Sequence, residues 1–333
     1  MSDSARGPGT GIDDNANDAS RRQDAGRYAP AREEAALPHL NFPHLGNLSL
    51  YLTAVLIWGT TWIAITYQLG VVPPAVSVVY RFALAAAILL VWCVLRSLPL
   101  KFGWRGHAAM AVQGSLLFGA NYVLVYLSEQ HIPSGLTAVI FCSMVFWNML
   151  GARVFFGTPL KARAWIGATL GVAGVGLVFA PELTIFSRGE DSLLGLGYGM
   201  ASALSASLGN LVAARNQRSG LPVVQQNAFG MLYGALLVAL WAAVTGQAFV
   251  FEGTTAYVIS LGYLALFGSV FAFGAYLTLL GRIGAERAGY VSVAIPIVAV
   301  LISTLFENFQ WHILTFAGVA LCVVGNVLVL QKK

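Results

Sequence analysis

The chain from residue 48 onward alternates between long apolar stretches and short polar breaks. Each apolar stretch holds roughly 20 residues, which is enough to cross about 30 Å of hydrocarbon as an α-helix. The strands of a membrane β-barrel would be about half as long and would alternate apolar with polar residues, which these stretches do not. We therefore predict an all-α integral membrane protein. Its ten transmembrane helices are predicted over residues 49–70, 73–95, 107–128, 133–156, 162–181, 193–214, 222–245, 255–280, 284–307 and 311–331.

Residues 1–47 have a different character. They are rich in Asp, Arg, Ala, Gly and Ser and show no apolar periodicity. They also lack the basic start, the apolar segment and the small-residue cleavage site that together make a signal peptide. We predict a disordered tail for this region.

Composition supports a membrane location. Hydrophobic residues make up 57% of the chain and charged residues only 10%, with a mean hydropathy of +0.72. A soluble domain carries about 25% charged residues, so this chain could not cover a water-exposed surface with polar groups. The three cysteines lie inside apolar stretches and form no CxxC pair, so we expect free thiols.

Positive charge gathers in alternate breaks between the predicted helices. Breaks two, four, six and eight, together with the C-terminus, hold twelve Lys and Arg residues, whereas the five opposite breaks hold only Arg188. Because basic loops stay in the cytoplasm, this bias places both termini there, as an even number of crossings requires. It also accounts for the net charge of +5. No basic stripe, RNA-binding signature or zinc-ligand spacing is present, so no nucleic-acid partner is expected.

A weak internal repeat relates the two halves of the chain. A shift of 151 residues places the segment 165–179 on 316–330, and it matches Gly167 with Gly318 and Gly174 with Gly325. Each half would then hold five spans, an odd number, so the second half would be inverted relative to the first. Inverted repeats are a recurring architecture of transporters, whose binding site lies near the midplane between the halves.

The sequence resembles the EamA family of the drug/metabolite transporter superfamily. The resemblance rests on "LIWGTTWIAITYQLG" (56–70), on "PPAVSVVYRFALAAAILL" (73–90) and on the Pro…Phe-Glu…Gly pattern within 295–330. It implies two inverted EamA-type repeats of five helices each, over residues 48–181 and 192–331. It also implies that spans one, three, four, six, eight and nine line a central cavity, and that export of a small metabolite is the commonest role.

Arg81 is the sharpest single candidate for a functional residue. It lies about eight residues into the second span, roughly 12 Å below its start at about 1.5 Å per residue. A charge at that depth costs at least ~2.5–3.5 kcal/mol, so it should face a partner or a watery cavity. Arg81 could anchor a substrate carboxylate, or it could be a structural residue bonded to backbone carbonyls.

Span nine offers two further candidates. Glu307 could gate the cavity, bind a proton, or be a hydrated carboxylate at a helix end. We expect no other carboxylate clearly within a span, which argues against proton coupling, since proton relays need buried acids. Pro296 should kink its helix and free a carbonyl, which either faces a ligand or is satisfied by neighbouring groups.

Polar and aromatic side chains recur on the six helices that the resemblance places around the cavity. Any one amide is more often a contact between helices than a ligand contact, but together the set suits an amphipathic metabolite. The candidate cavity residues are Trp58, Thr61, Trp62, Arg81, Gln113, Asn121, Tyr122, Tyr126, Asn148, Asn210, Tyr263, Tyr276 and Pro296. Small residues in spans five and ten allow close packing, and these spans are candidates for a scaffold edge or a homodimer seam.

A secondary transporter is the favoured function, with alternatives of other kinds. The expected cargo is an amino acid or a related amphipathic solute, exported across the inner membrane by alternating access. Uptake, exchange and lipid flipping by the same fold stay open. A membrane enzyme would need clustered His, Asp or Glu, but His131 and His312 are isolated. A sensor would need a signalling domain, for which the short loops leave no room. We predict no catalytic residue, metal or cofactor, and a small-molecule substrate and the lipid bilayer as partners.

Overall fold

The computed structural model describes residues 45–132, 134–159, 161–178, 180, 190–306 and 311–330. These residues belong to the larger of two units into which the chain divides, His39–Lys333. The predicted tail, apart from residues 45–47, and Glu307 lie outside the described residues.

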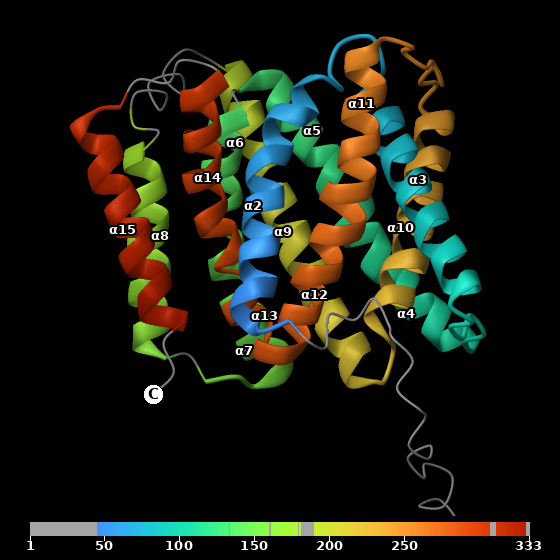
Figure 1. The fold of residues 1–333 in the computed structure, drawn as a ribbon, viewed down its shortest axis with the longest axis horizontal. Coiled ribbons are helices and arrows are strands. Elements are labelled where there is room, and N and C mark those ends of the chain that lie inside the picture. The colour runs from blue at the N-terminus through green and yellow to red at the C-terminus, as the bar shows by residue number, and fades with distance from the viewer. Residues whose placement is uncertain are drawn as a thin grey trace, which may run out of the picture. The chain divides into compact units, whose positions relative to one another are not determined.

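Every described secondary-structure element is a helix, and each of the ten predicted segments contains at least one described helix (Figure 1). The first half contains α2 (Asn47–Thr66), α3 (Pro74–Leu95), α4 (Trp104–Gly114), η2 (Ser115–Ala120), α5 (Asn121–His131), α6 (Ser134–Phe141), α7 (Met144–Phe156) and α8 (Ala162–Val178). The second half contains α9 (Glu190–Arg218), α10 (Val223–Val244), α11 (Thr255–Tyr263), η4 (Leu264–Phe271), α12 (Ala272–Ile283), α13 (Ala285–Ala288), α14 (Val291–Phe306) and α15 (Ile313–Leu330).

Seven of the described segments are long and apolar enough to cross a membrane. They are Asn47–Thr66, Pro74–Leu95, Trp104–His131, Thr137–Phe156, Val223–Val244, Thr255–Ile283 and Ala285–Ile302. The helices α8 and α15 are apolar but shorter, and α9 carries charged residues at both ends. The prediction of an all-helical membrane fold is therefore confirmed.

Proline and glycine set several helix ends. Pro74 opens α3 at its first position, where a missing N–H leaves no helical bond unmade. The helix α10 likewise follows Pro222. At the other end, α7 stops at Gly157, whose φ of +65° is a left-handed conformation that favours glycine.

Two spans contain π-helical segments at matching places in the two halves. The segment η2 interrupts the third span at 115–120, and η4 interrupts the eighth at 264–271. A shift of 151 residues carries the first range onto 266–271, inside the second. Each π-helical segment inserts extra backbone into a helix, which redirects the side chains that follow, and such segments often lie at functional sites.

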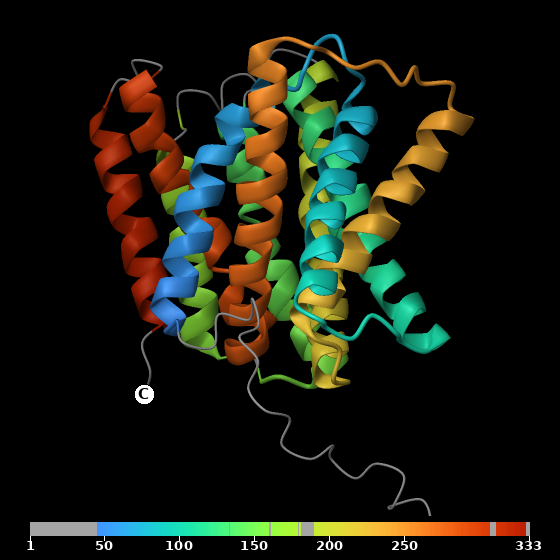
Figure 2. The ribbon, with the colours of Figure 1, turned by 45° about the vertical axis from the view of Figure 1, so that its right-hand side comes forward.

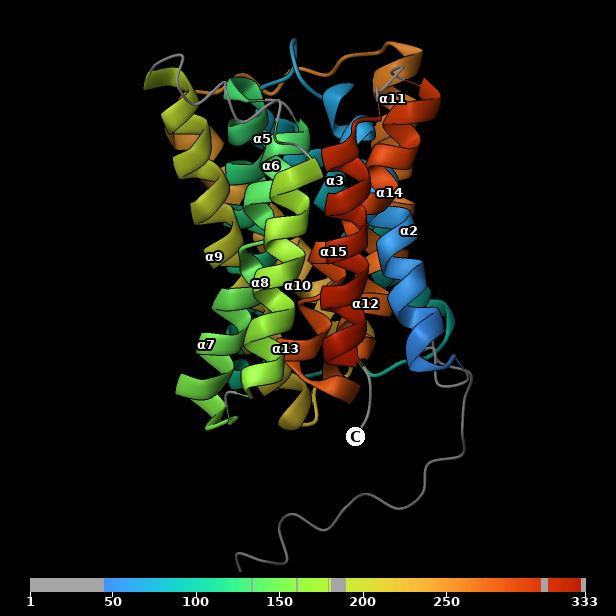
Figure 3. The ribbon, with the colours of Figure 1, turned by 90° about the vertical axis from the view of Figure 1, so that its left-hand side faces the viewer.

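The helices α8 and α15 pack side by side through their glycines (Figures 1 and 3). A Cβ on Gly167 would lie under 3.0 Å from the carbonyl oxygen of Gly325, and one on Gly325 would meet Gly167 in turn. Gly174 and Gly318 have the same reciprocal relation. Since Gly167 corresponds to Gly318 in the repeat, and Gly174 to Gly325, each helix contacts its counterpart through equivalent positions. That is the contact expected at a pseudo-two-fold axis between inverted repeats.

The α8–α15 pair closes one side of the bundle, and α3, α4 and α10 close the other (Figures 1 and 2). The start of α2 and the end of α15 lie at the same end of the bundle. The helices α7, α9 and α12 also end there, and their last turns carry Arg153, Arg215 and Arg282. We call this the basic end. By the positive-inside rule it would face the cytoplasm.

Candidate functional site

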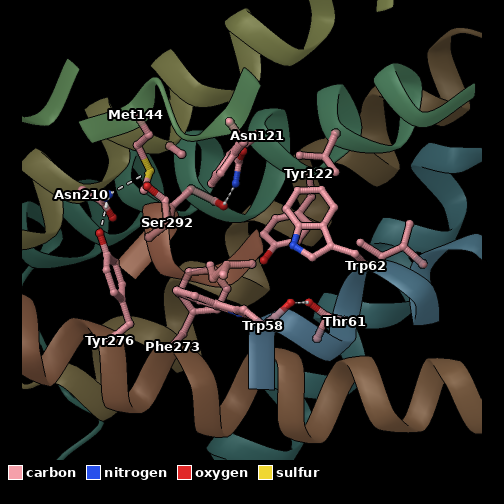
Figure 4. Close-up of a pocket in the computed structure, with 16 residues that line it drawn as sticks. Trp58, Thr61, Trp62, Asn121, Tyr122, Met144, Asn210, Phe273, Tyr276 and Ser292 are labelled. Atoms are coloured by element: carbon pink, nitrogen blue, oxygen red, sulfur yellow. Dashed lines mark hydrogen bonds between the residues drawn. The ribbon is translucent and has the colours of Figure 1, made fainter. Parts of the chain in front are cut away.

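A central cavity lies between the two halves of the bundle (Figure 4). About 590 Å³ of space is free of protein atoms here, a figure that includes the open solvent at its mouth. Its walls come from six of the predicted spans: one, three, four, six, eight and nine. The lining residues are Trp58, Thr61, Trp62, Ile65, Leu117, Asn121, Tyr122, Val125, Phe141, Met144, Ala206, Asn210, Phe273, Tyr276, Ser292 and Ile295.

Aromatic rings form much of the wall. The ring centroid of Trp58 lies 4.9 Å from that of Phe273 and 5.1 Å from that of Tyr276. The indole Nε1 of Trp58 donates a 3.0 Å hydrogen bond to the carbonyl of Gly268 in η4, which holds this ring in place. The ring centroids of Trp62 and Phe141 lie 6.2 Å apart in an edge-to-face arrangement. These rings provide an apolar surface of defined shape.

Several polar atoms around the cavity lack a hydrogen-bond partner. The Nε1 of Trp62 is an unused donor, and the Oδ1 atoms of Asn121 and Asn210 are unused acceptors. Buried polar groups are normally paired. A ligand that supplied both a donor and an acceptor between these helices would relieve all three. None of the cavity-lining residues is charged, so recognition here rests on neutral groups.

A polar cluster lies beside the cavity toward the basic end. The Nδ2 of Asn210 donates to the hydroxyl of Tyr276 at 2.8 Å (Figure 4). It also donates to Oδ1 of Asn148 at 3.5 Å. All three side chains are buried, and Nδ2 of Asn148 has no partner. The cluster joins spans four, six and eight across the centre of the bundle.

A second cavity opens beyond this cluster, at the basic end, with about 1430 Å³ of space including open solvent. It is lined by Ala152, Phe156, Thr158, Ala214, Gln217, Arg218, Val223, Thr278, Leu280, Gly281, Arg282, Ile283, Gly284, Ala285 and Glu286. The lining residues on α7, α9 and α12 all lie further along these helices, toward the basic end, than Asn148, Asn210 and Tyr276. The polar cluster therefore separates the two cavities.

Arg81 is fully buried behind the wall of the central cavity. Its Nε donates a 3.0 Å hydrogen bond to Oγ of Ser269 in η4, and its guanidinium carbon lies 4.5 Å from the ring centroid of Tyr122. Its two terminal nitrogens have no hydrogen-bond partner. Tyr122 lines the cavity, so Arg81 is one residue removed from it.

Glu129 corrects an expectation from the sequence. A carboxylate other than Glu307 was not expected clearly within a span, but α5 continues to His131 and includes Glu129. Both carboxylate oxygens are enclosed and have no hydrogen-bond partner. The helix continues here because it packs on α9, where the hydroxyl of Ser128 donates a 2.8 Å hydrogen bond to the carbonyl of Gly195.

The other predicted site residues lie outside the cavity lining. Gln113 accepts a 2.9 Å hydrogen bond from Asn216, and Tyr263 bonds Thr60 between spans one and eight. Tyr126 is fully buried and its hydroxyl has no partner. Asn148 belongs to the polar cluster, and Glu307 lies outside the described residues.

Pro296 lies inside α14, and the carbonyl it frees is used within the protein. Proline cannot donate to the carbonyl four residues earlier, which belongs to Ser292. The thiol of Cys142 lies 3.2 Å from that oxygen and donates to it. In this geometry the carbonyl of Ser292 is hydrogen-bonded by a neighbouring side chain, which is one of the two roles considered for it.

Some lining residues were not singled out from the sequence. Phe141, Met144, Phe273, Ser292 and Ile295 are among them. Phe273 precedes Tyr276 by three residues, so helical spacing alone could have placed both on one face. Met144 and Ile295 carry no such signal, because apolar residues cover every face of these spans.

Comparison with known proteins supplies the family. The model of the EamA-like transporter family matches residues 45–180 and again residues 193–331. The chain belongs to this family. The transporter is 27% identical over 284 residues to the uncharacterized inner membrane transporter YedA of Escherichia coli, which covers 84% of this chain and 88% of that protein. It is 22% identical over 293 residues to a probable amino-acid metabolite efflux pump of Escherichia coli, with coverages of 83% and 92%.

A solved crystal structure shares the fold. It aligns with a TM-score of 0.71 at 18% identity, over 85% of this chain and 96% of its own. Together with the apolar helices and the family match, these relatives identify a multi-pass inner-membrane transporter built from inverted repeats. No cluster of three potential metal ligands occurs among the described residues.

Proposed function

We propose that the transporter exports amino acids or related amphipathic metabolites by alternating access. The observation that carries this proposal is the central cavity, which combines aromatic walls with unpaired neutral donors and acceptors. The similarity to a probable amino-acid metabolite efflux pump supports the same class of cargo.

The cavity suits a solute with an apolar side chain and a polar head. The rings of Trp58, Trp62 and Phe273 would pack against the apolar part. The Nε1–H of Trp62 would donate to a carboxylate, and the Oδ1 atoms of Asn121 and Asn210 would accept from an ammonium group. Such a site would recognise the charged groups of a zwitterion by hydrogen bonds and would select the solute's side chain by its shape.

The position of the polar cluster supports alternating access. Asn148, Asn210 and Tyr276 close the central cavity toward the second cavity at the basic end. Breaking their hydrogen bonds would join the two cavities, and the pseudo-two-fold relation of the repeats provides an equivalent closure on the other side. Export then requires loading from the cytoplasm through the second cavity.

Counterflow in proteoliposomes tests the proposal. Purified protein would be reconstituted, loaded with one unlabelled amino acid at a time, and assayed for uptake of the labelled form. Trp62→Phe keeps an aromatic ring, although a smaller one, and removes the unpaired N–H, so it should weaken apparent affinity. Trp104→Phe, at a side chain that is 75% exposed, is the matched control. Folded protein that exchanges none of the common amino acids or their close derivatives would refute the proposal.

The direction of transport is tested separately, in cells. Overproduction of an exporter lowers the internal concentration of its cargo and raises tolerance to a toxic analogue. A transporter that instead raised the internal concentration would be an uptake carrier, and the export part of the proposal would fail.

A further inference from the structure

Three side chains between spans two and three have enclosed polar atoms: Arg81 and Tyr126 are buried, and Glu129 is half-buried with both carboxylate oxygens enclosed. Arg81 projects from α3, and Tyr126 and Glu129 project from α5. Tyr122, Tyr126 and Glu129 follow one another at spacings of four and three residues, so they occupy one face of the helix. Because α3 packs against α5, the positive charge of Arg81 and the carboxyl group of Glu129 lie on neighbouring helices.

Each of the three keeps at least one polar atom without a hydrogen-bond partner, although Nε of Arg81 bonds Ser269. The terminal nitrogens of Arg81, the hydroxyl of Tyr126 and both carboxylate oxygens of Glu129 are enclosed without a hydrogen-bond partner. Arg81 and Glu129 attract each other but form no hydrogen bond. An enclosed carboxylate that lacks a close partner is costly in its ionised form, whereas a protonated carboxyl carries no net charge.

Other elements packed on α5 contribute no second charge to Glu129. The helix contacts α3, α6, α9 and η2. From α6, Thr137 bonds Ser128 and is neutral. From α9, Asp191 pairs with His131 at 2.7 Å, and its side chain is 80% exposed. Of the described charged groups on these elements, Arg81 is the one that acts on Glu129.

Arg81 connects this group of three side chains to the substrate cavity. Its guanidinium carbon lies 4.5 Å from the ring of Tyr122, a cavity-lining residue. A Cβ on Gly268 would lie 3.1 Å from Nη2 of Arg81, and the carbonyl of the same Gly268 holds the indole of Trp58. A shift of either aromatic residue on substrate binding would therefore change the position of the charge that Glu129 senses.

We infer that Glu129 is the proton-binding site that couples this transporter to the proton gradient. The carboxylate takes up a proton on one side of the membrane and releases it on the other, so one proton moves opposite to each exported solute. Arg81 sets the balance, because its approach favours the ionised carboxylate and its withdrawal favours the protonated acid. The inference rests on the proposed transport function, which it deepens by naming the driving ion.

Proteoliposomes separate coupling from transport itself. Labelled phenylalanine is the probe, since its side chain suits the aromatic walls. Counterflow at equal pH needs only substrate exchange, whereas accumulation driven by an imposed pH gradient needs proton binding and release. The variant Glu129→Gln should keep counterflow and lose gradient-driven accumulation to the level of protein-free liposomes.

Glu252→Gln is the matched control, because Glu252 lies between α10 and α11 and accepts a 2.8 Å hydrogen bond that Gln can also accept. It should behave as wild type in both assays. A Glu129→Gln protein that still responds to the gradient, or a wild type whose accumulation ignores it, overturns the inference. Absence of counterflow in the wild type would instead count against phenylalanine as a substrate.

An infrared measurement tests Glu129 without any substrate. Difference spectra of the full-length protein in lipid, between acidic and alkaline buffer, should show a carboxylic-acid carbonyl band. The thirteen other Asp and Glu carboxyl groups of the chain absorb in the same region, so the test is the difference between proteins: the part of the band due to Glu129 should be missing from Glu129→Gln and kept in Glu252→Gln. Identical spectra for wild type and Glu129→Gln would overturn the inference whatever the transport assays give.

Discussion

Trp58 and Gly268 are joined by a 3.0 Å hydrogen bond from the indole nitrogen to the backbone carbonyl. The bond links the first span to the π-helical part of the eighth, across the boundary between the two halves. The carbonyl of Gly268 accepts the hydrogen bond from Trp58. A Cβ at Gly268 would point toward Arg81 and Thr61, so the space that a side chain would need is already taken by these two residues. One residue without a side chain thus holds a cavity wall and makes room for a buried cation.

Gly268→Ala should destabilise the protein. The new Cβ would lie 2.9 Å from Cγ2 of Thr61 and 3.1 Å from Nη2 of Arg81, so both neighbours must move. Overpacking of this kind costs about 1–3 kcal/mol. Unfolding in detergent, followed by a dye that reacts with exposed thiols, would measure the loss. Gly262→Ala, with nothing within 4 Å of its Cβ, should leave stability unchanged or slightly raised.

Gly174→Ala should loosen the contact between α8 and α15. Its Cβ would lie 2.6 Å from the carbonyl oxygen of Gly318 and 2.8 Å from the backbone nitrogen of Cys322, and backbone atoms cannot step aside as a flexible side chain can. We expect a loss of roughly 1–3 kcal/mol in the same unfolding assay. The neighbouring Gly176→Ala points into open space and serves as the control. Equal stability of the two variants would contradict the close packing described for this pair.

The hydrogen bond from Asn210 to Tyr276 should be measurable as a coupling energy. Tyr276→Phe removes the hydroxyl, and Asn210→Ala removes its donor. A double-mutant cycle of unfolding free energies should give an interaction of about 0.5–1.5 kcal/mol, typical of a buried neutral bond. Strictly additive effects would show that the two groups do not interact in the reconstituted protein.

Arg81→Lys should impair transport even though it keeps the positive charge. Lysine cannot reproduce the Nε bond to Ser269 together with the planar approach to Tyr122. We expect the initial rate of counterflow to fall by about tenfold, which corresponds to about 1.4 kcal/mol. Arg105→Lys is the control, since Arg105 is exposed and lies beside an exposed tryptophan. Unaltered transport by Arg81→Lys would assign Arg81 a purely structural role.

The helical segments were predictable because the hydrocarbon thickness sets their length. The glycine pairs of the repeat were also predictable, since glycine is distinctive in an apolar helix and the same glycine spacing recurs 151 residues later. Both signals depend on local composition. Neither needs knowledge of which helices meet.

The missed features depend on contacts between distant segments. A carboxylate usually marks the end of a span, but Glu129 lies within α5 because Ser128, one residue earlier, bonds α9. The amino-acid composition does not mark the π-helical segments, so the directions of the side chains that follow them could not be predicted from the sequence. For the carbonyl freed by Pro296 the decisive neighbour is Cys142, about 150 residues away in the sequence.

The contact between α8 and α15 is self-complementary, since each helix offers the other the surface that it receives. A half-length chain made alone would expose one copy of that surface, and a second copy of it could make the same contact only if inserted in the opposite orientation. Joining both halves in one polypeptide meets this condition. The covalent link thereby fixes the stoichiometry of the two repeats at one to one and ensures that they are inserted in opposite orientations.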